Sequence, residues 1–165
     1  MQAAAVRRFP HVPAGTGEAY NVIGELLTFK VTGAETNGTF TVVELLAQPG
    51  GGPPLHTHPS SEAFTILEGE FEFTGLDDDQ PYSFRATPGD TVFIPGNAPH
   101  TYQAVSDTPG KTMLVLTPGV EMEQFFAEAG VRVTPGDQPP TAPPDIPALL
   151  AVGQKHGLVF LGLDQ

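Results

Sequence analysis

Three histidines and one glutamate stand at spacings that suit a metal site. His56 and His58 are two residues apart, so in a β-strand both imidazoles point to the same face. Glu62 has the same parity, and His100 ends a second segment that reads as a strand entering a turn. Three imidazoles and a carboxylate suit a divalent first-row metal that keeps open positions for water or substrate. Three of the five histidines in the chain belong to this pattern.

The composition predicts an all-β protein with one domain. A chain of 165 residues can bury roughly 70% of the surface that it would expose when unfolded. The 19 glycines and 18 prolines are scattered between short runs of β-branched and aromatic residues. Such a distribution predicts many tight turns between short strands, as in a β-sandwich or barrel.

The charge balance excludes some classes of partner. Lys and Arg number 7 against 19 Asp and Glu, which gives a net charge of -12. Nucleic-acid binding needs a basic surface, so we expect no nucleic-acid partner. The chain has no cysteine and hence no disulfide, thiolate ligand or cysteine nucleophile. No apolar run is long enough for a membrane span, and the first residues lack a signal-peptide core, so we expect no membrane partner and a cytoplasmic location.

The pattern of apolar runs and turns predicts where the elements lie. We expect strands at residues 24–31, 39–47, 63–67, 70–74, 81–86, 91–94, 101–105 and 112–117. Residues 64–75 read as a hairpin that turns at Glu68 and Gly69, and the acidic run 77–79 reads as a loop. A short helix is expected over 120–129, and a second begins after the N-cap Asp145 and stops at Gly157. We therefore divide the chain into an N-terminal arm (1–20), a β-barrel (21–118) and a C-terminal helical extension that packs on the barrel (119–165).

The metal-site pattern belongs to a longer motif. Gly50, five residues, His56-x-His58, three residues, Glu62, six residues and Gly69 reproduce the first motif of the cupin superfamily without a gap. The chain therefore resembles a cupin, which implies a double-stranded β-helix, that is, a jelly-roll barrel. The segments around the first motif and after the last strand are similar to small single-domain cupins related to quercetin 2,3-dioxygenase.

The second cupin motif is present with two departures. Gly89, five residues, Pro95 and then His100 follow the motif. Asn97 stands where the family usually has glycine, and asparagine tolerates the left-handed backbone better than most residues. Ala104 replaces a frequent asparagine that is not a ligand. We therefore expect the turn to form and the metal site to remain intact.

The resemblance implies roles for the site residues. His56, His58, Glu62 and His100 correspond one by one to the cupin metal ligands. The sequence does not choose among Fe, Mn, Ni, Co, Cu and Zn for the single metal. Glu62 is also a candidate catalytic base, because burial in an apolar barrel brings the pKa of a carboxylate towards neutrality.

Three further residues are candidates for the substrate pocket. Tyr102 shares parity with His100 and should face the barrel interior. Phe64 and Ile66 share parity with Glu62 and should line the barrel wall, although such residues are more often plain core.

The subfamily resemblance implies a metal-dependent dioxygenase that uses O2 on a small hydroxylated aromatic or enolic compound. The alternatives are a binding or sensing cupin without turnover, and a metal-dependent isomerase, lyase or hydrolase. Phosphate substrates are disfavoured because no Lys or Arg lies within a motif. Cupins commonly form dimers, so the resemblance also implies a homodimer.

Overall fold

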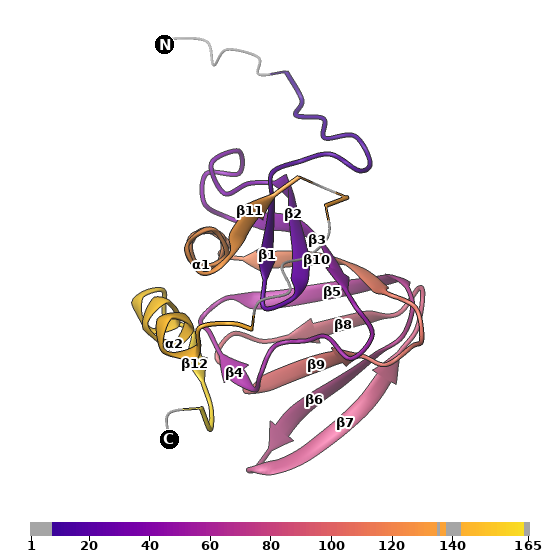
Figure 1. Cartoon of the computed structure of the whole chain (residues 1–165), viewed down its shortest axis with the longest axis vertical. Coiled ribbons are helices and arrows are strands. Elements are labelled where there is room, and N and C mark those ends of the chain that lie inside the picture. The colour runs from indigo at the N-terminus through magenta and orange to yellow at the C-terminus, as the bar shows by residue number, and fades with distance from the viewer. Residues whose placement is uncertain (1–7, 135, 138–142, 164–165) are drawn as a thin grey trace.

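Two antiparallel sheets form a jelly-roll barrel in the computed structural model, which describes residues 8–134, 136–137 and 143–163 (Figure 1). The first sheet has the strand order β11-β1-β2-β3-β10-β5-β8, and the second has the order β12-β4-β9-β6-β7. The strands of the first sheet are β1 (Ala19–Val22), β2 (Glu25–Val31), β3 (Thr41–Ala47), β5 (Ser61–Glu68), β8 (Thr91–Ile94), β10 (Gly110–Thr117) and β11 (Val131–Val133). Those of the second are β4 (His56–Thr57), β6 (Phe71–Asp77), β7 (Gln80–Ala86), β9 (His100–Ala104) and β12 (Val159–Phe160). The predicted fold class is confirmed.

Alternating burial explains why the longer strands were predictable. In β3 and β10 every second side chain is buried, so one face of each strand lies against the core. The core contains a group of aromatic rings, in which Phe64 and Phe73 both lie within 6 Å of the Tyr102 ring. All eight predicted strands are present, with ends that differ by at most three residues.

One predicted connection is wrong. The chain does turn after Glu68, where Gly69 has a φ of 72°, but β5 and β6 do not pair with each other. Strand β5 pairs with β10 and β8, whereas β6 pairs with β7 and β9, so the turn carries the chain from one sheet to the other. The observed hairpin is β6–β7, whose two turn residues Asp78 and Asp79 have φ values of 47° and 61°. Positive φ at both positions is the requirement of a two-residue type I′ turn.

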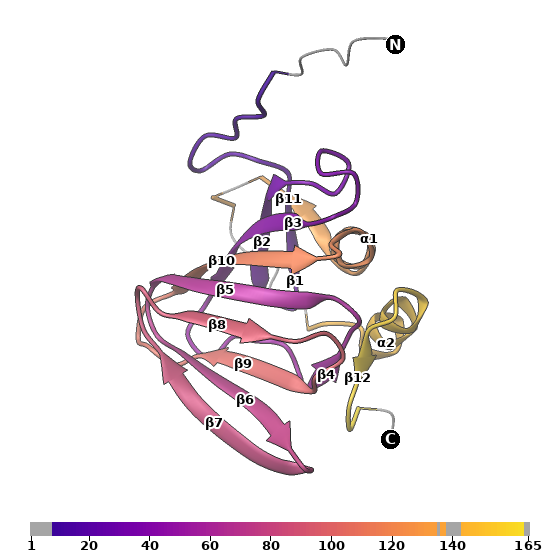
Figure 2. The same ribbon diagram turned by 180° about the vertical axis from the view of Figure 1, so that it is seen from behind.

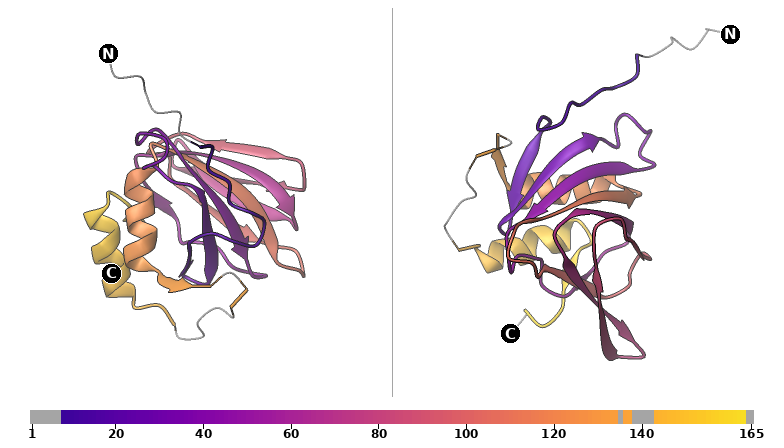
Figure 3. Two further views of the ribbon diagram at one scale, coloured as in Figure 1. Left: turned by 90° about the horizontal axis from the view of Figure 1, so that it is seen from above. Right: turned by 90° about the vertical axis from the view of Figure 1, so that its right-hand side faces the viewer.

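The C-terminal part contributes strands as well as helices. The helices are α1 (Val120–Ala129) and α2 (Ile146–Lys155), and both lie on the side of the barrel near β12 (Figures 2 and 3). Strand β11 joins the first sheet and β12 joins the second. The helices contact each other through His156, whose Nε2 lies 2.7 Å from the Glu128 carboxylate. No helix in the described part of the chain is long and apolar enough to cross a membrane.

Helix α2 begins and ends at the predicted residues. The carboxylate of Asp145 accepts a hydrogen bond from the Ala148 N–H at 3.1 Å, and Gly157 adopts a left-handed φ of 78° after the last turn. We expect Asp145→Ala to destabilise the protein by about 1 kcal/mol because it removes this N-cap. Urea unfolding measures the loss. The control Asp107→Ala removes the same charge from an exposed loop and should change stability by less than ~0.5 kcal/mol; equal losses in the two variants would contradict the capping role.

Candidate metal centre

The four predicted ligands come together at one end of the barrel. His56 is the first residue of β4 and lies directly opposite His100, the first residue of β9. His58 follows β4, and Glu62 is the second residue of β5. One ring nitrogen from each of the three histidines lies within 4.8 Å of the other two, and all three side chains are buried. The strand register therefore brings together residues that are more than 40 positions apart in the sequence.

The turn that contains the unusual asparagine helps to hold this arrangement. Asn97 has a φ of 64°, the left-handed conformation that the second motif requires, as predicted. Its N–H donates to the carbonyl oxygen of His58 at 2.7 Å. Gly96, next to it, allows a close approach, because a Cβ there would lie 2.2 Å from the carbonyl oxygen of Pro59. The segment before His100 is thus fixed against the segment around His58.

Backbone carbonyl groups orient two of the imidazoles. The Nδ1 atoms of His56 and His100 lie 2.8 Å from the carbonyl oxygens of Pro54 and Ala98, respectively. A carbonyl oxygen only accepts hydrogen bonds, so each Nδ1 carries a proton, and in the neutral imidazole Nε2 keeps its lone pair. This tautomer is the one that presents Nε2 to a metal ion.

The buried polar atoms of the centre fit a metal ion. The Glu62 oxygens lie 3.3 Å from His58 Nε2 and 3.0 Å from His100 Nε2. Even so, among the described residues neither imidazole nitrogen has a partner in hydrogen-bond geometry, and neither does Glu62 Oε2. Buried polar groups are normally satisfied, and a set that converges on one point without mutual hydrogen bonds suits a shared cation. The three histidines could hold a divalent metal, with the Glu62 carboxylate beside them.

The local electrostatics act differently on the candidate ligand groups. Burial, with a contribution from the charge of His100, lowers the pKa of His56 to about 3, so this imidazole is neutral. Burial alone would raise the pKa of Glu62, but the neighbouring His100 and His58 outweigh it and lower the pKa to about 2. Burial opposes protonation of His100, whereas the Glu62 carboxylate favours it more strongly, and the pKa is raised. Glu62 is therefore ionised at neutral pH, as a ligand should be, which makes it a weak base.

A small cavity of about 40 Å³ adjoins the centre. Its lining includes His56, Glu62 and the predicted pocket residue Tyr102. Phe64 and Ile66, by contrast, are fully buried and do not belong to the lining. They are core residues behind the cavity wall. The other lining residues are Val22, Ile23, Glu25, Leu27, Leu45, Pro53, Leu114, Met122, Phe125, Phe126, Leu158 and Phe160.

Two contributors to this cavity were not predicted from the sequence. The first is the C-terminal part, where α1 supplies Phe125 and β12 supplies Phe160, whose ring centroid lies 6.1 Å from that of His56. A two-residue strand gives no periodic signal that could reveal this contact. The second is Glu25, which is 4% exposed. Its parity with Leu27 and Phe29 was the available signal, because all three should point to the same face of β2.

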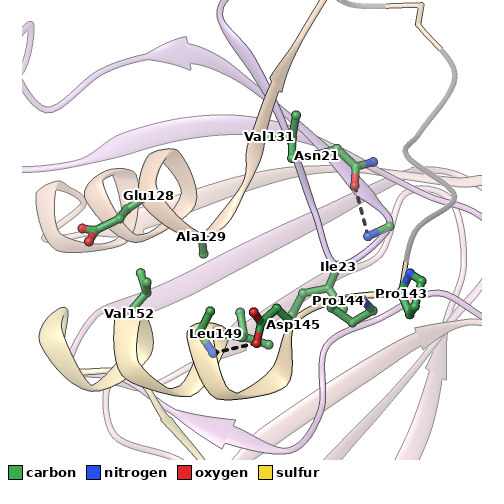
Figure 4. Close-up of a pocket in the computed structure, with 12 residues that line it drawn as sticks. Asn21, Ile23, Glu128, Ala129, Val131, Pro143, Pro144, Asp145, Leu149 and Val152 are labelled. Carbon is green, nitrogen blue, oxygen red and sulfur yellow. Dashed lines mark hydrogen bonds between the residues drawn. The ribbon is translucent and has the colours of Figure 1, made fainter.

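A larger pocket of about 420 Å³ lies next to the small cavity (Figure 4). It is formed by the β1–β2 turn, the end of α1 and the beginning of α2, and Ile23 lines both spaces. Its carboxylates already have partners: Asp145 caps α2, and Glu128 contacts Lys155 and His156. The remaining histidine, His11, is exposed near the N-terminus. Neither it nor His156 belongs to the three-histidine group.

A jelly-roll barrel that gathers three histidines and a glutamate from two motif segments has the architecture of a cupin. The sequence agrees, because residues 43–116 match the family described as Cupin domain. This part of the chain is therefore similar to cupin domains. No curated protein matches the sequence.

Several solved structures resemble this one. Peruvianin-I, a cysteine peptidase from Thevetia peruviana latex, is 27% identical with a TM-score of 0.51, and the match covers 58% of this chain and 62% of that one. The polyketide cyclase RemF from Streptomyces resistomycificus is 18% identical with a TM-score of 0.57, over 67% of this chain and 80% of that one. An RmlC-like cupin from Shewanella frigidimarina is 20% identical with a TM-score of 0.54, and the match covers 67% of this chain and 92% of that one. This chain thus spans less than two thirds of Peruvianin-I, and it contains no cysteine.

Proposed function

We propose that the protein is a metal-dependent dioxygenase that acts on a small hydroxylated aromatic or enolic compound. His56, His58, Glu62 and His100 would hold one divalent first-row metal. Such a metal supplies Lewis acidity and a site for O2 and for a substrate oxygen. The observation that carries the proposal is the convergence of buried ligand atoms without hydrogen-bond partners on a single point beside a cavity.

The residues around the centre suit the binding of a small organic compound. Most of the cavity lining is aliphatic or aromatic, and helix α1 and strand β12 cover it with Phe125, Phe126 and Phe160. Such a cover excludes water, which strengthens the interaction between charges inside and protects reactive species from hydrolysis. Few polar groups remain in the lining, namely His56, Glu62, Tyr102 and Glu25. A small number of placed polar groups in an apolar wall is typical of a site for a small organic molecule.

The cavity also restricts the substrate. A volume of 40 Å³ holds only a few water molecules. A compound the size of a flavonol would therefore have to extend past Ile23 into the 420 Å³ pocket, or the α1 and β12 cover would have to move. None of the described residues that line the small cavity is Lys or Arg, which argues against phosphate esters.

Oxygen consumption tests the proposal. The metal-loaded protein is mixed with a panel of phenols, flavonols and small diketones, and dissolved O2 is followed with an electrode. We expect at least one compound to cause O2 uptake that stops after the metal is removed by chelation and returns when it is restored. Turnover of a panel compound without O2 uptake would overturn the dioxygenase assignment in favour of an isomerase, lyase or hydrolase. Binding without any turnover would overturn it in favour of a binding protein.

A further inference from the structure

A second carboxyl group lies in the wall of the small cavity, outside both cupin motifs. Glu25 is the first residue of β2 and follows a two-residue turn, Ile23–Gly24, with φ values of 53° and 83°. Its partner across the turn is Val22. Positive φ is costly for a β-branched residue such as isoleucine. The turn therefore holds a strained conformation directly before the residue that enters the cavity.

One oxygen of this carboxyl group has a partner and the other has none. The Tyr102 hydroxyl donates to Glu25 Oε2 at 3.3 Å. Glu25 Oε1 is buried and has no hydrogen-bond partner among the described residues. Both side chains line the cavity together with His56 and Glu62. An unsatisfied buried oxygen costs stability, so its presence in a cavity wall points to a ligand that satisfies it.

The charges in the cavity favour a neutral Glu25. Glu62 is the ionised carboxylate, because His100 and His58 lie beside it. No Lys or Arg is found among the described lining residues, so a second carboxylate would have no basic side chain for a partner. Burial raises the pKa of Glu25 to about 8; the Tyr102 hydrogen bond lowers it, and the charge of Glu62 raises it further. With Oε2 accepting from Tyr102, the proton of the neutral group belongs on Oε1.

We propose that Glu25 is a substrate-contacting residue that donates a hydrogen bond from Oε1 to an oxygen atom of the bound compound. The inference rests on the proposed function, because the compound is taken to bind at the histidine centre. Tyr102 is a positioning residue that fixes which oxygen of Glu25 faces the compound. The class of compound follows from this donor: it carries a carbonyl oxygen or an ionised enol oxygen besides the oxygen that faces the histidines.

Binding of acetohydroxamate, a small oxygen-donor anion, to the zinc-loaded full-length protein tests the donor. Glu25→Leu removes the donor, and Glu25→Gln replaces it with an amide N–H. Glu44→Gln is the matched control, because Glu44 lies on the partly exposed face of the neighbouring strand β3. We expect all variants to bind one zinc ion per chain. The affinity for acetohydroxamate should fall about 10-fold or more in Glu25→Leu but only a few-fold in Glu25→Gln. Unchanged affinity in Glu25→Leu would overturn the proposal.

Infrared spectroscopy gives a second readout that needs neither metal nor turnover. In metal-free protein at pH 6, the C=O band of a neutral carboxylic acid should be present in the wild type and in Glu44→Gln and absent from Glu25→Gln. A wild-type spectrum in which no such band depends on Glu25 would overturn the inference even if the protein binds metal. Conversely, a wild-type protein that binds no metal but shows the band contradicts the proposed function and leaves the neutral Glu25 in place.

Discussion

Replacing His58 by alanine should reduce the bound metal to less than about one tenth of an ion per chain and abolish metal-dependent activity. The His58 imidazole has no hydrogen-bond partner among the described residues, and it lies beside both the His100 ring and the Glu62 carboxylate. We therefore propose that its role is metal coordination. Loss of residues that merely orient metal ligands costs roughly 10- to 100-fold in affinity or activity, so loss of a ligand should cost at least ~100-fold. His56→Ala should behave in the same way.

Elemental analysis of the purified variants measures this effect, and circular dichroism shows that the barrel still forms. His156→Ala is the control, because it also removes a buried imidazole, but one that contacts Glu128 between the two helices. This variant should keep the wild-type metal content. Full metal content in His58→Ala would show that the metal is held elsewhere.

Replacing Glu25 by glutamine should change how the stability of the metal-free protein depends on pH. The pKa of Glu25 is raised by burial to about 8 in the folded protein, against an ordinary value of 4.5. Between these values the unfolded chain releases the proton while the folded protein retains it, so rising pH favours unfolding. The free energy of unfolding of the wild type should therefore fall by about 1 kcal/mol per pH unit relative to that of Glu25→Gln over this window. Above pH 8 the difference in unfolding free energy between the two proteins should become constant.

Urea unfolding of both proteins at half-unit steps from pH 5 to 8.5 measures this difference. His56 titrates below this range, with a pKa of about 3, and both proteins share it, so it cancels from the comparison. The other ionisable groups that face Glu25 are Tyr102 and Glu62, whose pKa values are shifted out of the window, upwards and downwards respectively. Parallel stability curves would show that Glu25 is solvated and ionised.

Much of the barrel and of the centre was predictable because both depend on local patterns. Strands such as β3 and β10 are seven or eight residues long and alternate buried with partly exposed side chains, so their sequence alone identifies them. The ligands were predictable for the same reason, because His56 and His58 share parity and the two motifs have fixed spacing. The left-handed Asn97 followed from its position in the second motif.

The rest depends on contacts between distant segments. Strands β4 and β12 have two residues each, too few for a periodic pattern, yet their pairing brings Phe160 next to His56. The turn at Gly69 has the local features of a hairpin, but the pairing partners of β5 and β6 are chosen by the packing of the two sheets. Glu25 reads as an ordinary polar residue at a strand end. Its contact with the Tyr102 hydroxyl emerges only when β9 places that residue beside it.

Anomalous diffraction from crystals of the metal-loaded protein is the most direct test of the central claim that these four residues hold a metal. Data collected on both sides of the absorption edge locate the ion without reference to activity. We predict one strong peak per chain at coordination distance from His56, His58 and His100 nitrogens, about 2.0–2.1 Å for zinc, with the Glu62 carboxylate also bound. A peak at another site, or no peak after reconstitution with metal, would contradict the account.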